Sequence, residues 1–217
     1  HVYFFPSNRS ILLMSFSSLC SITKQHAYTI VFTSSECNSL TKDVIDKALI
    51  GDKRNNVRNK VLKQEIYEGQ RLIMASYKEK VGSVWEHAEY RLLHKPSVNT
   101  LSPVEKLLNK NPKDGCALFF TLNSPCQQYC TNTTGKYDII KDLDQFNKIN
   151  SAAFVFHKVY EEKRVTTCCS NSLKPIDEKV PVYRCNDKCH KCVNNKVFNA
   201  VCLKKTTWNP TCHLFHE

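Results

Sequence analysis

Two short segments of the chain are apolar almost throughout, and they constrain the fold more than any other feature of the sequence. One covers residues 116–122, between Gly115 and Asn123, and the other covers residues 152–156. A strand that is apolar on both faces must be covered on both faces, as the central strands of a parallel sheet are by their connecting helices. The two segments therefore predict an α/β protein with parallel strands at its centre.

Helix and strand signals alternate around these two segments. Thr41 begins a helix in which apolar residues recur at helical spacing until Gly51, and residues 70–78 are typical of a strand. Residues 52–63 are rich in Lys, Arg and Asn, and we interpret them as a solvated loop, with a nucleic-acid-facing patch as the alternative. Three capping boxes predict further helix starts. They begin at Ser83, Ser102 and Ser124.

The composition is that of a folded protein with a strong excess of basic residues. The chain has 217 residues, 41% of them hydrophobic, and 31 Lys and Arg against 20 Asp and Glu give a formal charge of +11. This size suits one compact domain with an elaborated end, and the charge favours polyanionic partners. With only 5 glycines and neither glycine-rich phosphate-binding motif, the sequence excludes the common nucleotide-binding loops. No apolar run reaches about 18 residues, so we predict no membrane span.

We divide the chain into three parts. Residues 11–22 have the length of the apolar region of a signal peptide, and we interpret residues 1–27 as a signal-peptide remnant. No small-residue cleavage site follows, so an ordinary N-terminal strand stays open as the alternative. Residues 28–165 form the main domain. Residues 166–217, which hold 7 of the 12 cysteines, form a cysteine-rich C-terminal extension.

One His, one Glu and two Cys form the candidate reactive centre. Cys126 and Cys130 are four residues apart, so a helix that begins at Ser124 would place both thiols on one face, near a helix N-terminus that lowers thiol pKa. His87 and Glu89 are two residues apart and would point in nearly opposite directions on a regular helix. We therefore expect the helix to begin close to His87, with both side chains aimed into one pocket.

One His and two Cys with an open fourth position are the ligands of a catalytic zinc site. Zinc lowers the pKa of a bound water towards about 7, and Glu89, unliganded but adjacent, can carry protons from that water to a substrate. These groups fit the hydrolytic deamination of an amino-heteroaromatic base. The alternative is that His87 faces solvent and that the two cysteines are halves of structural disulfides.

The segments 87–89 (His-Ala-Glu) and 125–130 (Pro-Cys-Gln-Gln-Tyr-Cys) resemble the H-x-E…P-C-x2–4-C signature of zinc-dependent nucleobase deaminases. The Ser-Pro-Cys sequence at 124–126 is similar to that of the AID/APOBEC polynucleotide cytidine deaminases, and the many cysteines resemble the secreted novel AID/APOBEC-like deaminases, the SNAD group. The resemblance covers about residues 41–164. It implies a three-layer α-β-α cytidine deaminase-like fold with a mixed five-stranded sheet and helices on both faces.

The resemblance also implies a role for individual residues. The zinc ligands would be His87, Cys126 and Cys130, the catalytic group Glu89, and the substrate contacts Ala88, Ser124, Trp85 and Tyr160. Tyr160 lies in the loop 157–162, which corresponds to the loop that reads the nucleotide 5′ to the target, and it would stack on a base or be partly buried at a strand end. Trp85 would line the pocket or pack in the core, and we favour packing.

The ten other cysteines fit an oxidising compartment, where most would form disulfides whose partners the sequence does not define. Cys116, inside a predicted core strand, is a candidate for a buried free thiol. An alternative for the C-terminal segment is a second zinc cluster. It would be drawn from Cys185, Cys189, His190, Cys192, Cys202, Cys212 and His213. Residues 132–134 (Asn-Thr-Thr) form an N-glycosylation sequon.

Together these features predict a secreted, extracellular, zinc-dependent hydrolase: a cytidine deaminase that acts on single-stranded DNA or RNA. Its positive charge would supply a salt-dependent attraction to the phosphate backbone. Innate immunity is the biological context that the resemblance implies. Two alternatives stay open, namely a deaminase of free nucleosides or nucleotides, and a non-catalytic secreted disulfide-rich binding protein with the deaminase fold.

Overall fold

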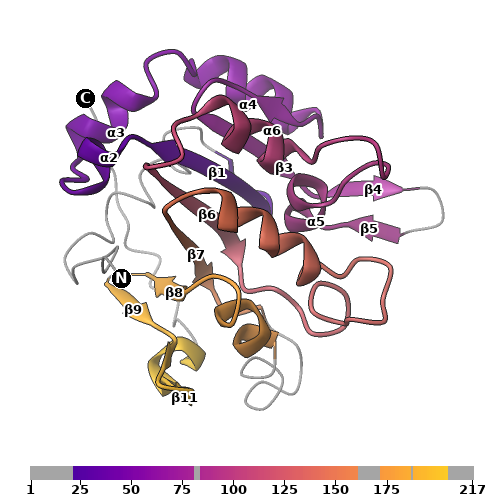
Figure 1. Cartoon of the computed structure of the whole chain (residues 1–217). Helices are drawn as coiled ribbons and strands as arrows, with labels where there is room; N and C mark the ends of the chain where they lie inside the picture. The colour runs from indigo at the N-terminus through magenta and orange to yellow at the C-terminus, as the bar shows by residue number, and fades with distance from the viewer. Residues whose placement is uncertain (1–21, 81–83, 161–171, 187, 205–217) are drawn as a thin grey trace.

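The computed structural model describes residues 22–80, 84–160, 172–186 and 188–204 (Figure 1). Its centre is a seven-stranded mixed sheet with the strand order β2-β3-β1-β6-β7-β8-β9. The strands of this sheet are β1 (His26–Phe32), β2 (Tyr67–Glu68), β3 (Leu72–Ser76), β6 (Cys116–Asn123), β7 (Ser151–Lys158), β8 (Val182–Cys185) and β9 (Cys189–Lys191). β6, β7 and β8 run parallel, whereas β1 is antiparallel to both of its neighbours, β3 and β6.

The helical elements are short. They are α2 (Ser34–Cys37), α3 (Lys42–Ala48), α4 (Arg54–Leu62), α5 (Ala88–Leu93), α6 (Pro103–Lys110) and the 3-10 helices η1 (Lys141–Lys148) and η2 (Ala200–Leu203). A further helical segment occupies residues 172–177. Among the described helices, none has the length and apolar character that crossing a membrane requires.

The two apolar segments form neighbouring central strands, as predicted. β6 and β7 pair in parallel, with Phe119 opposite Phe154. Phe119 packs into one hydrophobic core, whereas Leu118 and Phe120 pack into another on the opposite face of the sheet. Both faces of these strands are therefore covered, as their uninterrupted apolar pattern requires.

The helices cover the two faces of the sheet, which confirms the three-layer α-β-α fold (Figure 1). On one side, α5, α6 and η1 contribute Leu92, Leu107 and Phe146 to the first core. On the other side, α3 and α4 contribute Ile45 and Val57 to the second core. The two halves of the zinc signature meet in this arrangement, since His87 at the start of α5 contacts Cys130 in the turn that follows β6.

The main sheet has seven strands rather than the predicted five. The additional strands, β2 and β9, are short edge strands that lack the alternation by which a strand is recognised in a sequence. Two smaller sheets pair β4 (Lys78–Lys80) with β5 (Val84–Glu86) and β10 (Val193–Asn194) with β11 (Val197–Phe198). β8 and β9 belong to the C-terminal segment 166–217, so the main sheet continues into that segment. At the other end β1 begins at His26, and residues 1–21 of the interpreted signal segment lie outside the described residues.

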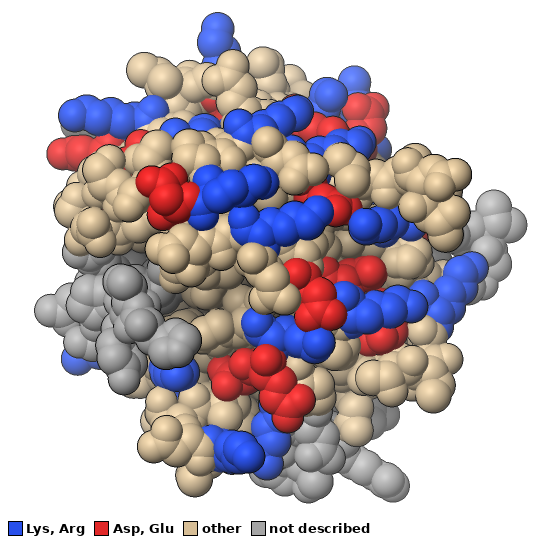
Figure 2. Space-filling view, viewed as in Figure 1, with Lys and Arg blue, Asp and Glu red and all other residues tan. Residues whose placement is uncertain are grey.

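The prediction of a loop at residues 52–63 is wrong, because α4 occupies most of this segment. Val57 and Val61 are four residues apart and fully buried, so one face of the helix packs on the sheet while its Lys and Arg residues face solvent. On the side of the molecule shown in Figure 2, basic side chains alternate with Asp and Glu. The excess positive charge is therefore not gathered into one patch on this side.

The three predicted capping boxes have different outcomes. Ser102 caps α6 as predicted, its hydroxyl accepting a hydrogen bond from the Glu105 amide at 3.0 Å. The box at Ser83 does not begin a helix, since residues 84–86 form β5, in keeping with the high strand propensity of Val and Trp. The box at Ser124 leads into a single turn rather than a helix, in which the Cys130 amide donates to the Cys126 carbonyl at 3.1 Å.

Three disulfides join cysteines within the described part of the chain. They are Cys37–Cys116, Cys185–Cys189 and Cys192–Cys202. The prediction that Cys116 is a buried free thiol is therefore wrong: its partner on α2 is 79 residues away in sequence and invisible to local patterns. The two C-terminal disulfides also contradict the second zinc cluster, because they occupy four of its cysteines. Cys20, Cys168, Cys169, Cys212 and His213 lie outside the described residues.

We expect the Cys37–Cys116 disulfide to contribute more to stability than Cys192–Cys202. The sequence separations are 79 and 10 residues, and cross-linking a longer loop removes more entropy from the unfolded chain, about 4–5 against about 3 kcal/mol. The free energy of unfolding of the two double Cys→Ala variants, measured in denaturant, tests this. A larger loss for the Cys192/Cys202 variant would contradict it.

Candidate metal centre and active-site pocket

The position of His87 is set by the junction between a strand and a helix. It directly follows β5 and is the N-cap of α5, with extended backbone angles (φ −65°, ψ 148°). His87 precedes the first helical residue, and Glu89 is the second residue of the helix. The side chain of His87 therefore need not follow the helical spacing that would point residues 87 and 89 in nearly opposite directions. The helix begins at Ala88, close to His87, as the sequence predicted.

The two cysteines are placed by the turn that follows β6. Both thiols are buried, and their Sγ atoms are 3.7 Å apart, which is a contact between free thiols and not a disulfide bond. The start of this turn is fixed to β7 by the Ser124 amide, which donates to the Lys158 carbonyl at 2.7 Å. Because their sulfur atoms are too far apart for a disulfide bond, Cys126 and Cys130 are not halves of structural disulfides.

The three candidate ligands have the spacing of a zinc site. Nδ1 of His87 is 3.2 Å from Sγ of Cys130 and 3.8 Å from Sγ of Cys126. In a tetrahedral site with ordinary Zn–S and Zn–N bonds, the N···S distance is about 3.6 Å and the S···S distance about 3.8 Å. Within the described residues these three side chains form a group that could hold a metal ion. The donor types and the distances both fit zinc with one position left for water or substrate.

The electrostatics of the cluster also favour a cation. The hydrogen bond from Cys130 lowers the pKa of Cys126 to about 4, and His87 adds to this effect, so Cys126 is a thiolate at neutral pH. The hydrogen bond with Cys126 and burial both raise the pKa of the Cys130 thiol. The hydrogen bond with Cys126 also raises the pKa of His87. The protons in the hydrogen bonds among His87, Cys126 and Cys130 are those that a bound metal ion would displace.

Glu89 is a buried carboxyl group with a full set of donors. It is 2% exposed, and its Oε1 accepts from the Thr121 hydroxyl at 2.7 Å. Nε2 of Gln25 lies 3.2 and 3.1 Å from its two oxygens. Burial raises the pKa of Glu89, against the opposing effects of His87 and Thr121. A carboxyl that is held in place and resists ionisation is suited to accept and return a proton.

A cavity of about 640 Å³ opens over these groups. Its described lining residues are Gln25, Tyr77, Trp85, His87, Glu89, Asn123, Ser124, Cys126, Gln128, Tyr129 and Tyr160. Trp85 packs edge-on against Tyr77 at 4.9 Å and remains 44% exposed. The floor of the cavity is thus polar and its rim aromatic, as expected for a site that holds a flat ring by its polar edge.

Comparison with known proteins identifies the family. The model of Secreted Novel AID/APOBEC-like Deaminase 1 (SNAD1) matches residues 10–206. The chain belongs to this family. The match spans both halves of the zinc signature and the C-terminal disulfides, and it confirms the relationship to the SNAD group that the sequence predicted. Neither the curated proteins nor the solved structures include a match to the chain.

Most of the predicted site residues meet in this SNAD1 pocket. Besides His87, Cys126 and Glu89, it is lined by Trp85, Ser124 and Tyr160, whereas Cys130 contacts His87 and Cys126 without being one of the lining residues. Trp85 does not pack in the core, contrary to the interpretation we favoured. The Tyr160 amide donates to the Ser124 hydroxyl at 2.9 Å, which joins the two rims, and the side chain of Tyr160 is exposed rather than partly buried. Residues 161 and 162 of its loop lie outside the described residues.

Ala88 is the exception among the predicted substrate contacts. Its side chain is fully buried in the hydrophobic core and does not line the cavity. Packing of the methyl group against the sheet seats the first turn of α5.

Several lining residues were missed. Gln128 and Tyr129 lie between the two cysteines of the candidate cluster, where the motif itself could have marked them. Gln25 fell within the segment interpreted as a signal peptide, and its contact with Glu89 joins residues 64 positions apart. No local pattern in the sequence indicates such a contact.

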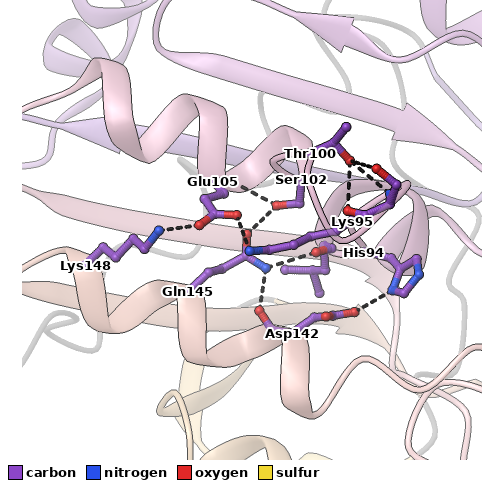
Figure 3. A network of polar contacts seen from close by, with 10 residues as sticks. His94, Lys95, Thr100, Ser102, Glu105, Asp142, Gln145 and Lys148 are labelled. Atoms are coloured by element: carbon purple, nitrogen blue, oxygen red, sulfur yellow. Dashed lines mark hydrogen bonds and ion pairs between the residues drawn. The ribbon is translucent and has the colours of Figure 1, made fainter.

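A polar network holds the far end of α5 in this SNAD1 chain (Figure 3). Gln145 of η1 donates to the Leu93 carbonyl at 3.0 Å and accepts a hydrogen bond from the Ser102 hydroxyl at the start of α6. His94, which ends α5, lies 3.0 Å from the carboxylate of Asp142 on η1. These contacts fix α5 at the end opposite His87, so this candidate metal ligand is attached to a helix that is held in place.

Two further interactions complete this support. Glu105, buried on α6, forms ion pairs with Lys95 and Lys148 (Figure 3). Within α5 itself, Arg91 donates to the carbonyl oxygens of Ser76 at 2.6 Å and Gln64 at 2.8 Å. The helix is thus tied to β3 and to the end of α4.

We expect the purified protein to contain stoichiometric zinc that depends on the cluster. His87→Ala and Cys126→Ser should each lose most of the bound metal, because each removes one of three ligands. Glu89→Gln should retain it, because Glu89 is not a ligand. Elemental analysis of dialysed protein measures this, with circular dichroism to establish that each variant is folded. If His87→Ala and Cys126→Ser keep their full zinc content, the assignment of these residues as zinc ligands is wrong.

Proposed function

We propose that this protein is a secreted zinc-dependent cytidine deaminase that converts cytosine to uracil in single-stranded DNA or RNA, with a role in innate immunity. The observation that carries the proposal is the buried carboxyl of Glu89 beside the His87–Cys126–Cys130 cluster, at the base of a cavity with an aromatic rim. Membership of the SNAD1 family supports the same chemistry.

The residues divide the work of the reaction. When bound, zinc would supply a water activated for attack on the ring carbon that bears the amine. Glu89 accepts the two protons of that water in turn and delivers one to the ring nitrogen and the other to the amine, which leaves as ammonia. Thr121 and Gln25 keep its carboxyl oriented throughout. Water and cytosine give uracil and ammonia, with no other reactant.

The rim of the cavity supports a polynucleotide substrate. Tyr129 and Tyr160 are 45% and 43% exposed, and Trp85 is exposed to the same degree. Exposed aromatic rings around a base-binding cavity can stack on the flanking bases of a single strand. Lys24 and Lys78 directly adjoin the lining residues Gln25 and Tyr77 in sequence, and they would attract the backbone.

One observation favours a second candidate, a deaminase of free nucleosides. None of the described residues that line the cavity is Lys or Arg, so none of them offers the permanent positive charge that would hold a phosphate. A neutral nucleoside has no phosphate, so its binding would not need such a charge. The two candidates differ in their dependence on salt, because only backbone binding releases counterions.

Deaminase activity should depend on Glu89 and not on a neighbouring acid. Glu89→Gln should lower the rate of cytosine-to-uracil conversion in a single-stranded oligonucleotide by about 10²–10⁴-fold, since it removes the proton carrier. Glu86→Gln, the same change three residues away, should leave the rate close to wild type. Conversion is measured by cleavage at uracil. Full activity of Glu89→Gln would remove this residue from the mechanism.

The same assay separates the two substrate classes. The polynucleotide enzyme should convert the oligonucleotide faster than free cytidine, and its rate should fall steeply as salt is raised. A preference for free cytidine with little salt dependence would favour the nucleoside enzyme. A zinc-loaded protein that converts neither would leave the non-catalytic binding protein.

Passage through the secretory pathway should leave a glycan on Asn132. Asn132 is exposed in a turn, and its Oδ1 accepts from both the amide and the hydroxyl of Thr134. Protein secreted from eukaryotic cells should carry an N-linked glycan on the peptide that contains residue 132, detected by mass before and after glycosidase treatment. Asn132→Gln and Thr134→Ala should lack it. Thr133→Ala, which keeps the sequon, should retain it, and an unmodified wild-type peptide would argue against secretion by this route.

A further inference from the structure

We propose that Oε1 of Gln25 is a binding site for the exocyclic amine of the substrate base, and that it distinguishes substrate from product. This inference rests on the proposed deaminase function and deepens it. It assigns to Gln25 a second role besides the support of Glu89, that of recognising a hydrogen-bond donor on the ring.

The orientation of the Gln25 carboxamide is fixed by its surroundings. Nε2 faces three acceptors: the two oxygens of Glu89 at 3.2 and 3.1 Å, and the Thr121 hydroxyl at 3.4 Å. A carboxylate requires a donor opposite it, so rotating the amide by half a turn would place oxygen against oxygen. Gln25 therefore presents its nitrogen to Glu89 and its oxygen elsewhere.

That oxygen is left without a partner. Oε1 of Gln25 is buried, and no described residue donates a hydrogen bond to it. Buried acceptors in folded proteins are mostly satisfied, so an unsatisfied one beside a cavity calls for an explanation. Because Gln25 also lines the cavity, a ligand in that cavity can supply the missing donor.

The distances put Oε1 within reach of an amine that is bound next to Glu89. In a carboxamide the oxygen is about 2.2 Å from the nitrogen, so Oε1 lies within about 5.5 Å of both Glu89 oxygens. Glu89 has to approach the amine to about 3 Å to give it a proton. An amine at that distance from Glu89 can also reach Oε1, and an amine carries two hydrogens, so it can use both contacts.

The contact would favour cytosine over uracil. The amine of cytosine donates to Oε1, whereas the carbonyl oxygen that replaces it in uracil is an acceptor and would leave two oxygens facing each other. A site built to accept from a substrate N–H group discriminates strongly against a ligand that lacks it. The same oxygen would thus assist both the binding of the substrate and the release of the product.

The test compares ligands that differ only at this ring position. Gln25→Met keeps the length of the side chain and removes the amide. Dissociation constants are measured by fluorescence anisotropy for otherwise identical single-stranded oligonucleotides with one target base: cytosine, uracil, or 2-pyrimidinone, which has neither amine nor oxygen there. The cytosine ligand is measured at low temperature within the time before turnover, and KM and kcat are measured separately. Gln128→Met, at another glutamine that lines the cavity, is the matched control.

Gln25→Met should weaken binding of the cytosine oligonucleotide by about ten- to hundredfold. Binding of the uracil and 2-pyrimidinone ligands should be unchanged or tighter, so the preference for cytosine collapses, and KM should rise accordingly. Gln128→Met should keep the preference. An equal loss for all three ligands, or no change for any, would overturn the proposal, because either result means that Oε1 does not read the amine.

These results remain separable from the failure of the proposed reaction. If wild-type protein converts no cytosine but prefers the cytosine oligonucleotide, and Gln25→Met abolishes that preference, the binding site stands and the catalytic function falls. If wild-type protein deaminates cytosine but Gln25→Met leaves the cytosine/uracil preference intact, the function stands and the site falls. Thermal unfolding of Gln25→Met at the wild-type temperature shows that a lost preference is not a lost fold.

Discussion

The arrangement of the whole site depends on the burial of β6 on both faces. A slip of one residue in β6 would turn every side chain to the opposite face of the sheet and so into the wrong core. β1 and β7 pair with it along both edges, and the Cys37–Cys116 disulfide fastens its first residue. With the register fixed, Thr121 faces Glu89, and the turn beyond Asn123 delivers the two thiols to His87. The positions of Thr121 and of the two thiols therefore depend on the register of β6.

The features that the sequence predicted correctly are those with a local cause. The apolar strands β6 and β7 can be recognised from composition alone, and α6 from Ser102 and the proline that follows it. The zinc signature was found for a similar reason, because each half is a short segment with its own chemistry. That the two halves form one site was implied by the resemblance to the deaminase signature, because neither half alone indicates where the other lies.

The features that could not be predicted arise from contacts between distant parts of the chain. Cys116 has its partner 79 residues away, and Gln25 reaches Thr121 across 96. The capping box at Ser124 satisfied a local rule, yet the chain forms a single turn there. A continuing helix is not needed to bring Cys130 back over Cys126, and the turn is secured instead by the bond from Ser124 to Lys158. Tertiary contacts overrode local propensity at the very segment that carries the ligands, as is expected where a site demands a special geometry.

Glu89 shows how the requirements of chemistry and of folding are joined in this molecule. A buried carboxyl destabilises a protein unless donors surround it, and the donors here come from the segment before β1 and from β6, 64 and 32 residues away. The carboxyl can therefore be accommodated only when β1, β6 and α5 are already assembled, so Glu89 reaches its buried, hydrogen-bonded environment in the completed fold and not before. The same assembly determines what the site lacks. Once Nε2 of Gln25 has been committed to the carboxylate, its oxygen has no donor among the described residues, which leaves a buried acceptor beside the carboxyl group.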